Sequence, residues 1–203
     1  MDVKACQMLE RIAVSSLEKC AAKLTRISAG KWSVAGARVV WRSMEEAVIE
    51  RGKGGAGEAV YFEVKGEHPF TSMAVFSPAD IEAISHGFLG FSFSKLTKLN
   101  KAQELLLSEL GNIILNSFIS AFSNALNRSF LPSAPKSVRG EAKALLEALW
   151  TSFEPNRRQG LVTVTMDLRC QDKVTRVEVI SVLSESLERE VMNAASSAVN
   201  RAG

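Results

Sequence analysis

Three polar side chains that could act together lie at helical spacing in the second half of the chain. Glu109, Asn112 and Asn116 are three and then four residues apart, so on a helix they share one face. A carboxylate accepts hydrogen bonds, whereas a carboxamide both donates and accepts them, so this set could orient a polar partner. An ordinary solvated helix face has the same pattern, and spacing alone favours that simpler interpretation.

Other side chains of reactive type lack the partners that their chemistry needs. His68 and His86 are the only two histidines and have no carboxylates grouped around them in sequence, so no metal site is expected. No serine has a histidine base at a familiar spacing. Cys6, Cys20 and Cys170 are far apart and odd in number, which favours reduced, partly buried thiols.

The three polar residues belong to a long apolar-periodic stretch, residues 99–130, which predicts a helix. Pro132 and Pro135 are expected to end it, because proline cannot continue a helix. The band predicted to face the core consists of Leu106, Leu110, Ile113, Ile114, Ser117, Ala121 and Phe122.

The elements around this helix follow the same order in each half of the chain. In the first half we expect a helix over 2–28, a strand over 37–41, a short helix over 43–50, strands over 59–64 and 70–76, and a helix over 77–88. In the second half we expect the helix over 99–130, a strand over 136–138, a helix over 140–153, strands over 161–169 and 174–182, and a helix from 184.

The repeated order predicts an internal duplication. Glu10 and Glu109 are 99 residues apart, and the strands that begin at Ala59 and Val162 are 103 apart. We therefore expect one α+β domain over 1–203, made of repeats at about 1–92 and about 99–203 and related by a pseudo-two-fold axis. Its sheet should have roughly six strands, largely antiparallel, with long helices packed on one face.

The bulk composition excludes several classes of function. The net charge is +3, and 25 basic residues are scattered among 22 acidic ones, which disfavours a nucleic-acid interface. The first residues do not resemble a secretion signal, and no uncharged apolar run reaches the roughly eighteen residues of a membrane span. A cytoplasmic protein without membrane contact is expected.

The segment from Ser108 to Pro135 resembles the signature of the CheC, CheX and FliY phosphatases. That signature is Glu, two residues, Asn, twenty-two residues and Pro, and Glu109, Asn112 and Pro135 match it. The duplicated order of elements is a second match, most similar to CheC. By this resemblance Glu109 and Asn112 are catalytic, and Asn116 and Pro135 contribute to substrate binding.

Several positions depart from the pattern of the family. Leu105 stands four residues before Glu109, where the family has Asp or Ser. In the first half Glu10 aligns with the family's Glu, but Ala13 replaces the Asn, and Cys6 and Gly36 replace the other two signature positions. An alanine cannot hold a water molecule, so the first site is expected to be degenerate.

The resemblance implies hydrolysis of the aspartyl phosphate on a CheY-like receiver of chemotaxis signalling. The receiver would supply Mg²⁺, and the chain would need no cofactor of its own. Asn112 would hold a water in line with the scissile bond, a positioning role like that of glutamine in some GTPases. Glu109 would pair with the receiver's active-site lysine.

A non-catalytic role is the alternative. The same fold could serve as an interaction module that binds a receiver, the deamidase CheD or components of the flagellar switch. Leu105 and the loss of Asn at position 13 favour this alternative, because they show that signature positions have changed in this chain.

Overall fold

The structure is a computed structural model that describes residues 3–51, 56–90, 101–151 and 159–200. The segment between the halves, residues 91–100, lies outside the described part, as do residues 52–55 and 152–158. The first half contains α1 (Val3–Ile27), β1 (Trp32–Ser43), α2 (Met44–Arg51), β2 (Ala56–Lys65), β3 (Phe70–Phe76) and α3 (Pro78–Leu89). The second half contains α4 (Lys101–Leu126), β4 (Leu131–Pro132), β5 (Lys136–Glu141), α5 (Ala142–Thr151), β6 (Gln159–Cys170), β7 (Lys173–Ser184) and α6 (Glu185–Asn200).

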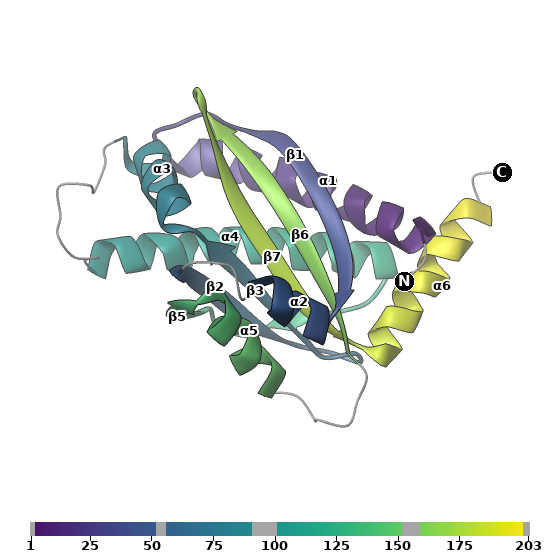
Figure 1. Cartoon of the computed structure of the whole chain (residues 1–203). Helices are drawn as coiled ribbons and strands as arrows, with labels where there is room; N and C mark the ends of the chain where they lie inside the picture. Colours follow the sequence, from purple (N-terminus) through teal and green to yellow (C-terminus); the bar gives the residue numbers. More distant parts are fainter. Residues whose placement is uncertain (1–2, 52–55, 91–100, 152–158, 201–203) are drawn as a thin grey trace.

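The strands form one seven-stranded sheet in the order β1-β6-β7-β3-β2-β4, with β5 also paired to β2. All of these pairings are antiparallel, which confirms the predicted α+β fold class. Each half contributes a hairpin, and the two hairpins meet where β3 pairs with β7 at the centre of the sheet (Figure 1). The core therefore draws on both halves, as expected for two repeats that share one domain.

A row of cross-strand partners shows the pseudo-two-fold symmetry. Ala74 of β3 pairs with Val179 of β7, and their outer neighbours are Val60 and Val164. The next partners outward are Ser137 of β5 and Val39 of β1. Ser137 and Val39 are therefore counterparts in the two halves, and they are 98 residues apart in the sequence. The short helices agree with this shift, because α2 begins at Met44 and α5 begins 98 residues later, at Ala142.

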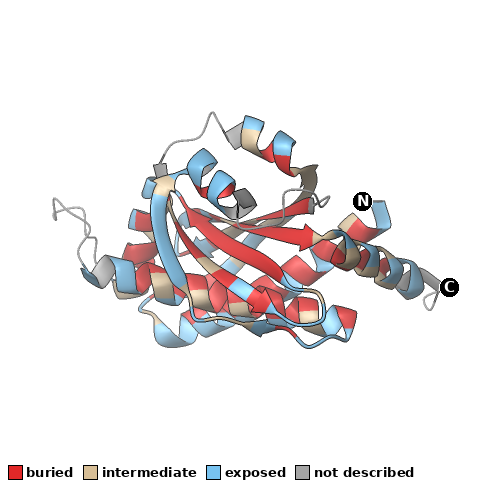
Figure 2. Cartoon of the chain, turned by 90° about the horizontal axis from the view of Figure 1, so that it is seen from below, coloured by how far each residue is buried: buried red, intermediate tan, exposed pale blue. Residues whose placement is uncertain are grey.

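The long helices are packed on one face of the sheet, as predicted, and the other face of the sheet is buried as well. The long helices α1 and α4, together with α3 and α6, cover one face, and the short helices α2 and α5 cover part of the other (Figures 1 and 2). The second face has its own apolar cluster, which includes Ala47, Leu145 and Ile180. The continuous apolar runs in the central strands follow from this burial on both sides.

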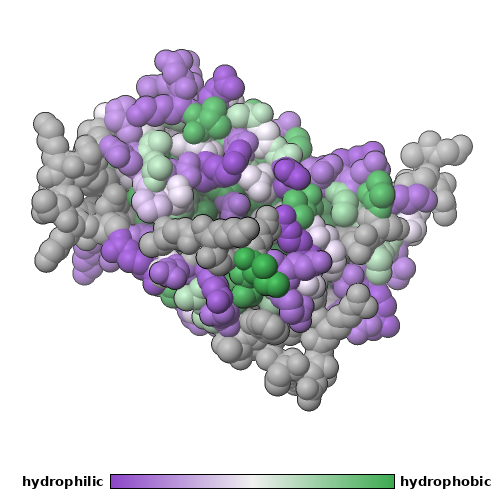
Figure 3. Space-filling model, viewed as in Figure 1, coloured by the Kyte–Doolittle hydropathy of each residue, from purple (hydrophilic) through white to green (hydrophobic). Residues whose placement is uncertain are grey.

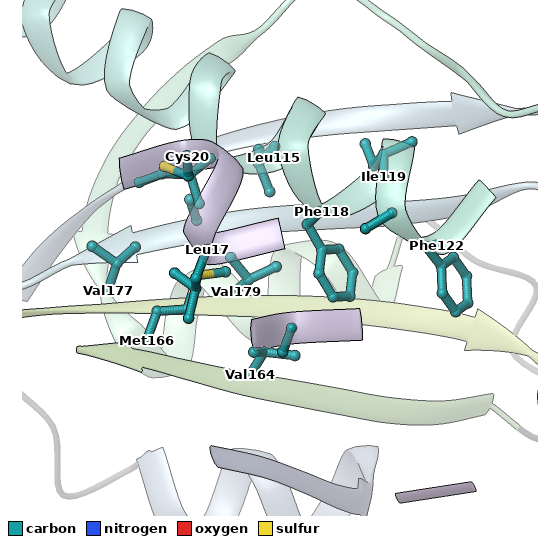
Figure 4. Packing of buried hydrophobic residues seen from close by; sticks show 14 of the residues in the cluster. Leu17, Cys20, Leu115, Phe118, Ile119, Phe122, Val164, Met166, Val177 and Val179 are labelled. Carbon is teal, nitrogen blue, oxygen red and sulfur yellow. The ribbon is translucent and has the colours of Figure 1, made fainter. Parts of the chain in front are cut away.

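The larger cluster fixes the position of α4. Figure 4 shows Leu17 and Cys20 of α1 and Leu115, Phe118 and Phe122 of α4 gathered over β6 and β7. The ring of Phe122 is stacked with the rings of Phe118 and Phe130, at centroid distances of 5.9 and 5.7 Å. The second half of α4 is thereby held rigidly against the core.

The end of α4 and the start of the next strand differ from the expectation. The helix ends at Leu126, before either proline, because Asn127 adopts a left-handed backbone conformation with φ of 52°. The backbone N–H of Arg128 then donates to the carbonyl of Ser123 at 3.0 Å, which caps the helix. Pro132 and Pro135 instead divide the strand that corresponds to β1 into β4 and β5, because proline cannot donate to a strand ladder. This division explains why seven strands are found where about six were expected.

Candidate functional site

The helix α4 approaches the sheet most closely at Gly111. A Cβ atom at this position would lie 2.5 Å from Cβ of Val60 in β2, so only glycine fits there. With 3.6 residues per turn, residues 105, 109, 112 and 116 then lie on the side of α4 that faces away from the sheet. We call this set, Leu105, Glu109, Asn112 and Asn116, the outer ridge.

The outer ridge is partly open to solvent. Glu109 is exposed, and Leu105 has 64% of its surface accessible, which is high for a leucine. Asn112 and Asn116 are half-buried. The predicted catalytic pair, Glu109 and Asn112, therefore lies on the face of the molecule that is formed by the long helices. The opposite face, which carries α2 and α5, is a mixture of hydrophilic and apolar patches (Figure 3).

The two carboxamides of the outer ridge are hydrogen-bonded to each other. The Nδ2 group of Asn116 donates to the side-chain Oδ1 of Asn112 at 2.7 Å and to the backbone carbonyl of Asn112 at 2.9 Å. The amide of Asn112 is thus held by its oxygen, and its own N–H groups point away from Asn116. Sequence spacing predicted that these residues share a face, but not the direction in which either amide points.

Pro135 does not lie on the outer ridge. It is half-buried between β4 and β5, in the break of the strand that pairs with β2. The signature positions of the second half are thus split between a helix that covers the sheet and a segment at the edge of the sheet.

The residues of α1 align with those of α4 at a separation of 98 residues, one fewer than the 99 predicted from the sequence. Buried residues of α1 correspond to buried residues of α4 when the shift is 98, the value that also relates β1 to β5. The corresponding pairs are Leu9 and Leu107, Ala13 and Gly111, and Leu17 and Leu115.

This shift changes which residues would occupy the predicted degenerate site of the first half. Ala13 is fully buried and corresponds to Gly111, not to Asn112. The counterparts of Glu109 and Asn112 are Arg11 and Val14, which are both exposed. Glu10 is also exposed, but it corresponds to the position just before Glu109. The first helix therefore presents neither a carboxylate nor a carboxamide at these two positions.

A polar cluster that sequence reasoning missed connects the β2–β3 turn to α6 and to the end of α4. Nε2 of His68 lies 2.7 Å from a Glu190 carboxylate oxygen, and its Nδ1 lies 3.2 Å from the hydroxyl of Ser186. The other oxygen of Glu190 accepts from Arg128 at 2.5 Å. No sequence signal relates His68 to Ser186, since 118 residues separate them.

The described residues hold no group of three His, Cys, Asp or Glu side chains that could bind a metal ion. Cys20 is packed among apolar side chains, and this burial raises the pKa of its thiol to about 12. Burial also raises the pKa of the Cys170 thiol. The thiols of both residues are therefore core groups and do not belong to the outer ridge.

The stretch from Glu104 to Leu126 is long and apolar enough to cross a membrane, judged by length and composition alone. In the structure 67% of this stretch is buried inside the domain. Its apolar character is explained by its contacts with β2, α1 and α6.

Comparison with solved structures identifies the fold. FliY from Thermotoga maritima superposes with a TM-score of 0.72 at 14% identity, over 97% of this chain and 98% of that one. The chain has the fold of FliY. The FliM middle domain from Vibrio alginolyticus matches with a TM-score of 0.60 at 10% identity, over 92% and 99% of the two chains.

The FliY fold also occurs in a protein crystallised with a partner. A chain of the FliG–FliM complex from H. pylori matches with a TM-score of 0.63 at 9% identity, over 95% of this chain and all of that one. The predicted resemblance to the CheC, CheX and FliY family is thereby confirmed for the fold, whereas the closer similarity to CheC stays a prediction. At 9–14% identity this likeness is one of fold alone. No protein-family model and no curated protein matches the sequence.

Proposed function

We propose that this chain accelerates hydrolysis of the aspartyl phosphate on a CheY-like receiver of chemotaxis signalling. The observation that carries the proposal is the placement of Asn112 beside exposed Glu109, on the side of α4 turned away from the sheet. Because Glu109 is exposed there, a docking receiver can reach its carboxylate without any rearrangement of the core. The proposal places the chain in the cytoplasm, where receivers act.

The proposed mechanism relies on positioning. Asn112 enters the receiver's active site and orients a water molecule in line with the bond between phosphorus and the aspartate oxygen. As water attacks, that bond breaks, and the aspartate carboxylate and inorganic phosphate are released. Mg²⁺ bound by the receiver would neutralise the developing charge, so the mechanism asks for no metal from this chain. Glu109 pairs with the receiver's active-site lysine and fixes the docking register.

The rigidity of α4 supports this mechanism. A positioning group contributes most when its own conformation is already fixed before the partner arrives. Gly111 allows the middle of α4 to pack directly against Val60 of the sheet. The stacked rings around Phe122 hold the second half of α4. The backbone that carries Asn112 is thus set by the core and does not depend on the partner.

A second candidate function is binding without catalysis. Leu105 is 64% exposed on the same ridge, one turn before Glu109, where an apolar side chain favours a protein contact. The fold is shared with FliM, which was crystallised in a complex with FliG. Under this alternative the chain would bind a receiver, CheD or a component of the flagellar switch and leave the phosphate untouched.

One experiment separates the two functions. Phosphate release from a phosphorylated CheY-like receiver is measured with and without the chain, and binding is measured in parallel with a stable phosphoryl mimic on the receiver. Faster release at catalytic amounts of the chain supports the phosphatase. Binding with an unchanged phosphate lifetime supports the interaction module and contradicts catalysis.

A further inference from the structure

The hydrogen bonds between Asn116 and Asn112 fix the orientation of both carboxamides. The backbone carbonyl of Asn112 is an acceptor only, so the group of Asn116 that lies 2.9 Å from it must be the NH₂ group. The same NH₂ group lies 2.7 Å from the side chain of Asn112, which must present its oxygen, because two amide nitrogens at this distance would repel each other. The backbone carbonyl oxygen of Asn112, which can only accept, thus determines which end of the Asn112 side-chain amide faces Asn116.

This orientation determines which groups of Asn112 remain available to a partner. One lone pair of Oδ1 is occupied by Asn116, and the second can still accept a hydrogen bond from water. No described residue accepts a hydrogen bond from the Asn112 NH₂ group, which can therefore donate to a phosphoryl oxygen. The arrangement provides one acceptor for the attacking water and donors for the phosphoryl group.

We propose that Asn116 is a positioning residue, which holds the Asn112 carboxamide in the orientation required for hydrolysis without touching the substrate. This inference rests on the proposed phosphatase function and gives Asn116 a role different from the substrate contact expected from sequence. Its side chain is half-buried, and its NH₂ group donates to both the side chain and the backbone of Asn112, one turn earlier along α4. A free asparagine side chain would sample both amide orientations, and only one of them offers an acceptor on the correct side.

The substitution Asn116→Asp tests the polarity of this contact at constant size. A carboxylate cannot donate, so the substituted side chain would repel Oδ1 of Asn112 and accept from its NH₂ group instead, which turns the amide over. We expect kcat for phosphate release to fall ~10-fold or more, since a misplaced reactive group costs up to about 10²-fold. KM should change little, because Glu109 and the docking surface are untouched. Asn116→Ala, which frees the amide but does not turn it over, should lose less activity than Asn116→Asp.

Asn124→Asp is the matched control. It introduces the same charge by the same chemical change on the same helix, at an exposed position two turns beyond Asn116. A general effect of negative charge on docking to a receiver would appear in both variants and would raise KM. An effect on amide orientation would appear only at position 116 and would lower kcat.

A second measurement reports the orientation without any receiver. In ¹⁵N-labelled protein the side-chain NH₂ protons of Asn112 should move downfield and exchange more slowly with water in Asn116→Asp, because they gain a carboxylate acceptor. They should not change in Asn124→Asp. Unchanged NH₂ resonances in Asn116→Asp would overturn the proposed contact.

The kinetic outcomes distinguish this inference from the function on which it rests. An active parent chain and an Asn116→Asp variant with the parental kcat would overturn the positioning role and leave the phosphatase function intact. A parent chain that does not shorten the phosphate lifetime would overturn the function itself. An active parent, a low kcat for Asn116→Asp and a normal Asn124→Asp support both.

Discussion

Gly111 of α4 lies directly against Val60 of β2, so closely that a Cβ atom on the glycine would be 2.5 Å from Cβ of the valine. This contact sets the rotation of α4 about its axis as well as its distance from the sheet. Because each residue of the outer ridge is about 100° or more around the helix from Gly111, the same contact turns Glu109 and Asn112 away from the sheet. A helix rotated by a quarter turn would direct one of them towards its neighbours.

Gly111→Ala should destabilise the protein. The added methyl group collides with Val60, and overpacking of this kind costs ~1–3 kcal/mol, which exceeds the up to ~1 kcal/mol that alanine contributes to a helix interior. Urea unfolding monitored by circular dichroism measures the change in the free energy of unfolding. Ser120→Ala, at an exposed position of α4, controls for helix propensity. A Gly111→Ala protein as stable as the parent would show that α4 is not seated as described.

Asn112→Ala should abolish most of the phosphatase activity. Loss of one preorganised group that acts in the transition state lowers kcat by on the order of 10²-fold. Affinity for a receiver carrying a stable phosphoryl mimic should remain near that of the parent, because Glu109 and Leu105 stay in place. Phosphate release and equilibrium binding, measured side by side, check both expectations. Equal kcat for variant and parent is incompatible with the water-positioning role.

Glu109→Gln should weaken docking. The substitution keeps size and removes the charge that is proposed to meet a lysine of the receiver. The dissociation constant should therefore rise by roughly 10- to 100-fold, as expected for a charge-assisted hydrogen bond of about 1.5–3 kcal/mol. Isothermal titration with the phosphoryl mimic measures this change. Glu10→Gln on α1 is the control, because Glu10 is exposed but does not occupy the counterpart of Glu109. Similar effects of the two substitutions would contradict a specific role for Glu109.

Glu190→Gln should lower stability more than Glu67→Gln does. Glu190 joins His68 and Arg128 with only 18% of its side chain exposed, whereas the Glu67 side chain that also contacts Arg128 is 65% exposed. Loss of a largely buried, charged hydrogen-bond partner costs ~1–3 kcal/mol, and loss of an exposed ion pair costs at most about 1 kcal/mol. Thermal unfolding of the two variants compares them directly. Equal losses would indicate that the cluster contributes no more than a surface ion pair.

Cys20 should resist thiol reagents in the folded protein. The thiolate is the reactive form, and burial raises the pKa of Cys20 to about 12, so at pH 8 the thiol stays protonated as well as shielded. Half-buried Cys6 should react first with a disulfide reagent. All three cysteines should react after unfolding in guanidinium chloride, which serves as the control. Rapid reaction of Cys20 in native buffer would contradict its placement in the core.

The sequence by itself determined the order of the elements, the duplication and the helix that carries the outer ridge. These features depend on local patterns: apolar periodicity, turn residues and the spacing of Glu109, Asn112 and Asn116 along one helix. The sequence also showed that the two prolines interrupt regular structure, but the prediction that they end the helix was wrong. Asn127 ends α4 through its backbone conformation, whereas Pro132 and Pro135 interrupt a strand.

Only the tertiary structure decided how the two halves are aligned and which way the amides point. A shift of one residue along α1 moves Ala13 from the position of Asn112 to that of Gly111, and only the cross-strand register and the pattern of burial distinguish the two. The His68–Glu190 contact likewise joins residues that are far apart in the chain. Helical spacing specifies which residues share a face, but the packing of that helix against a sheet specifies which face is turned to solvent, because burial is a property of the whole fold.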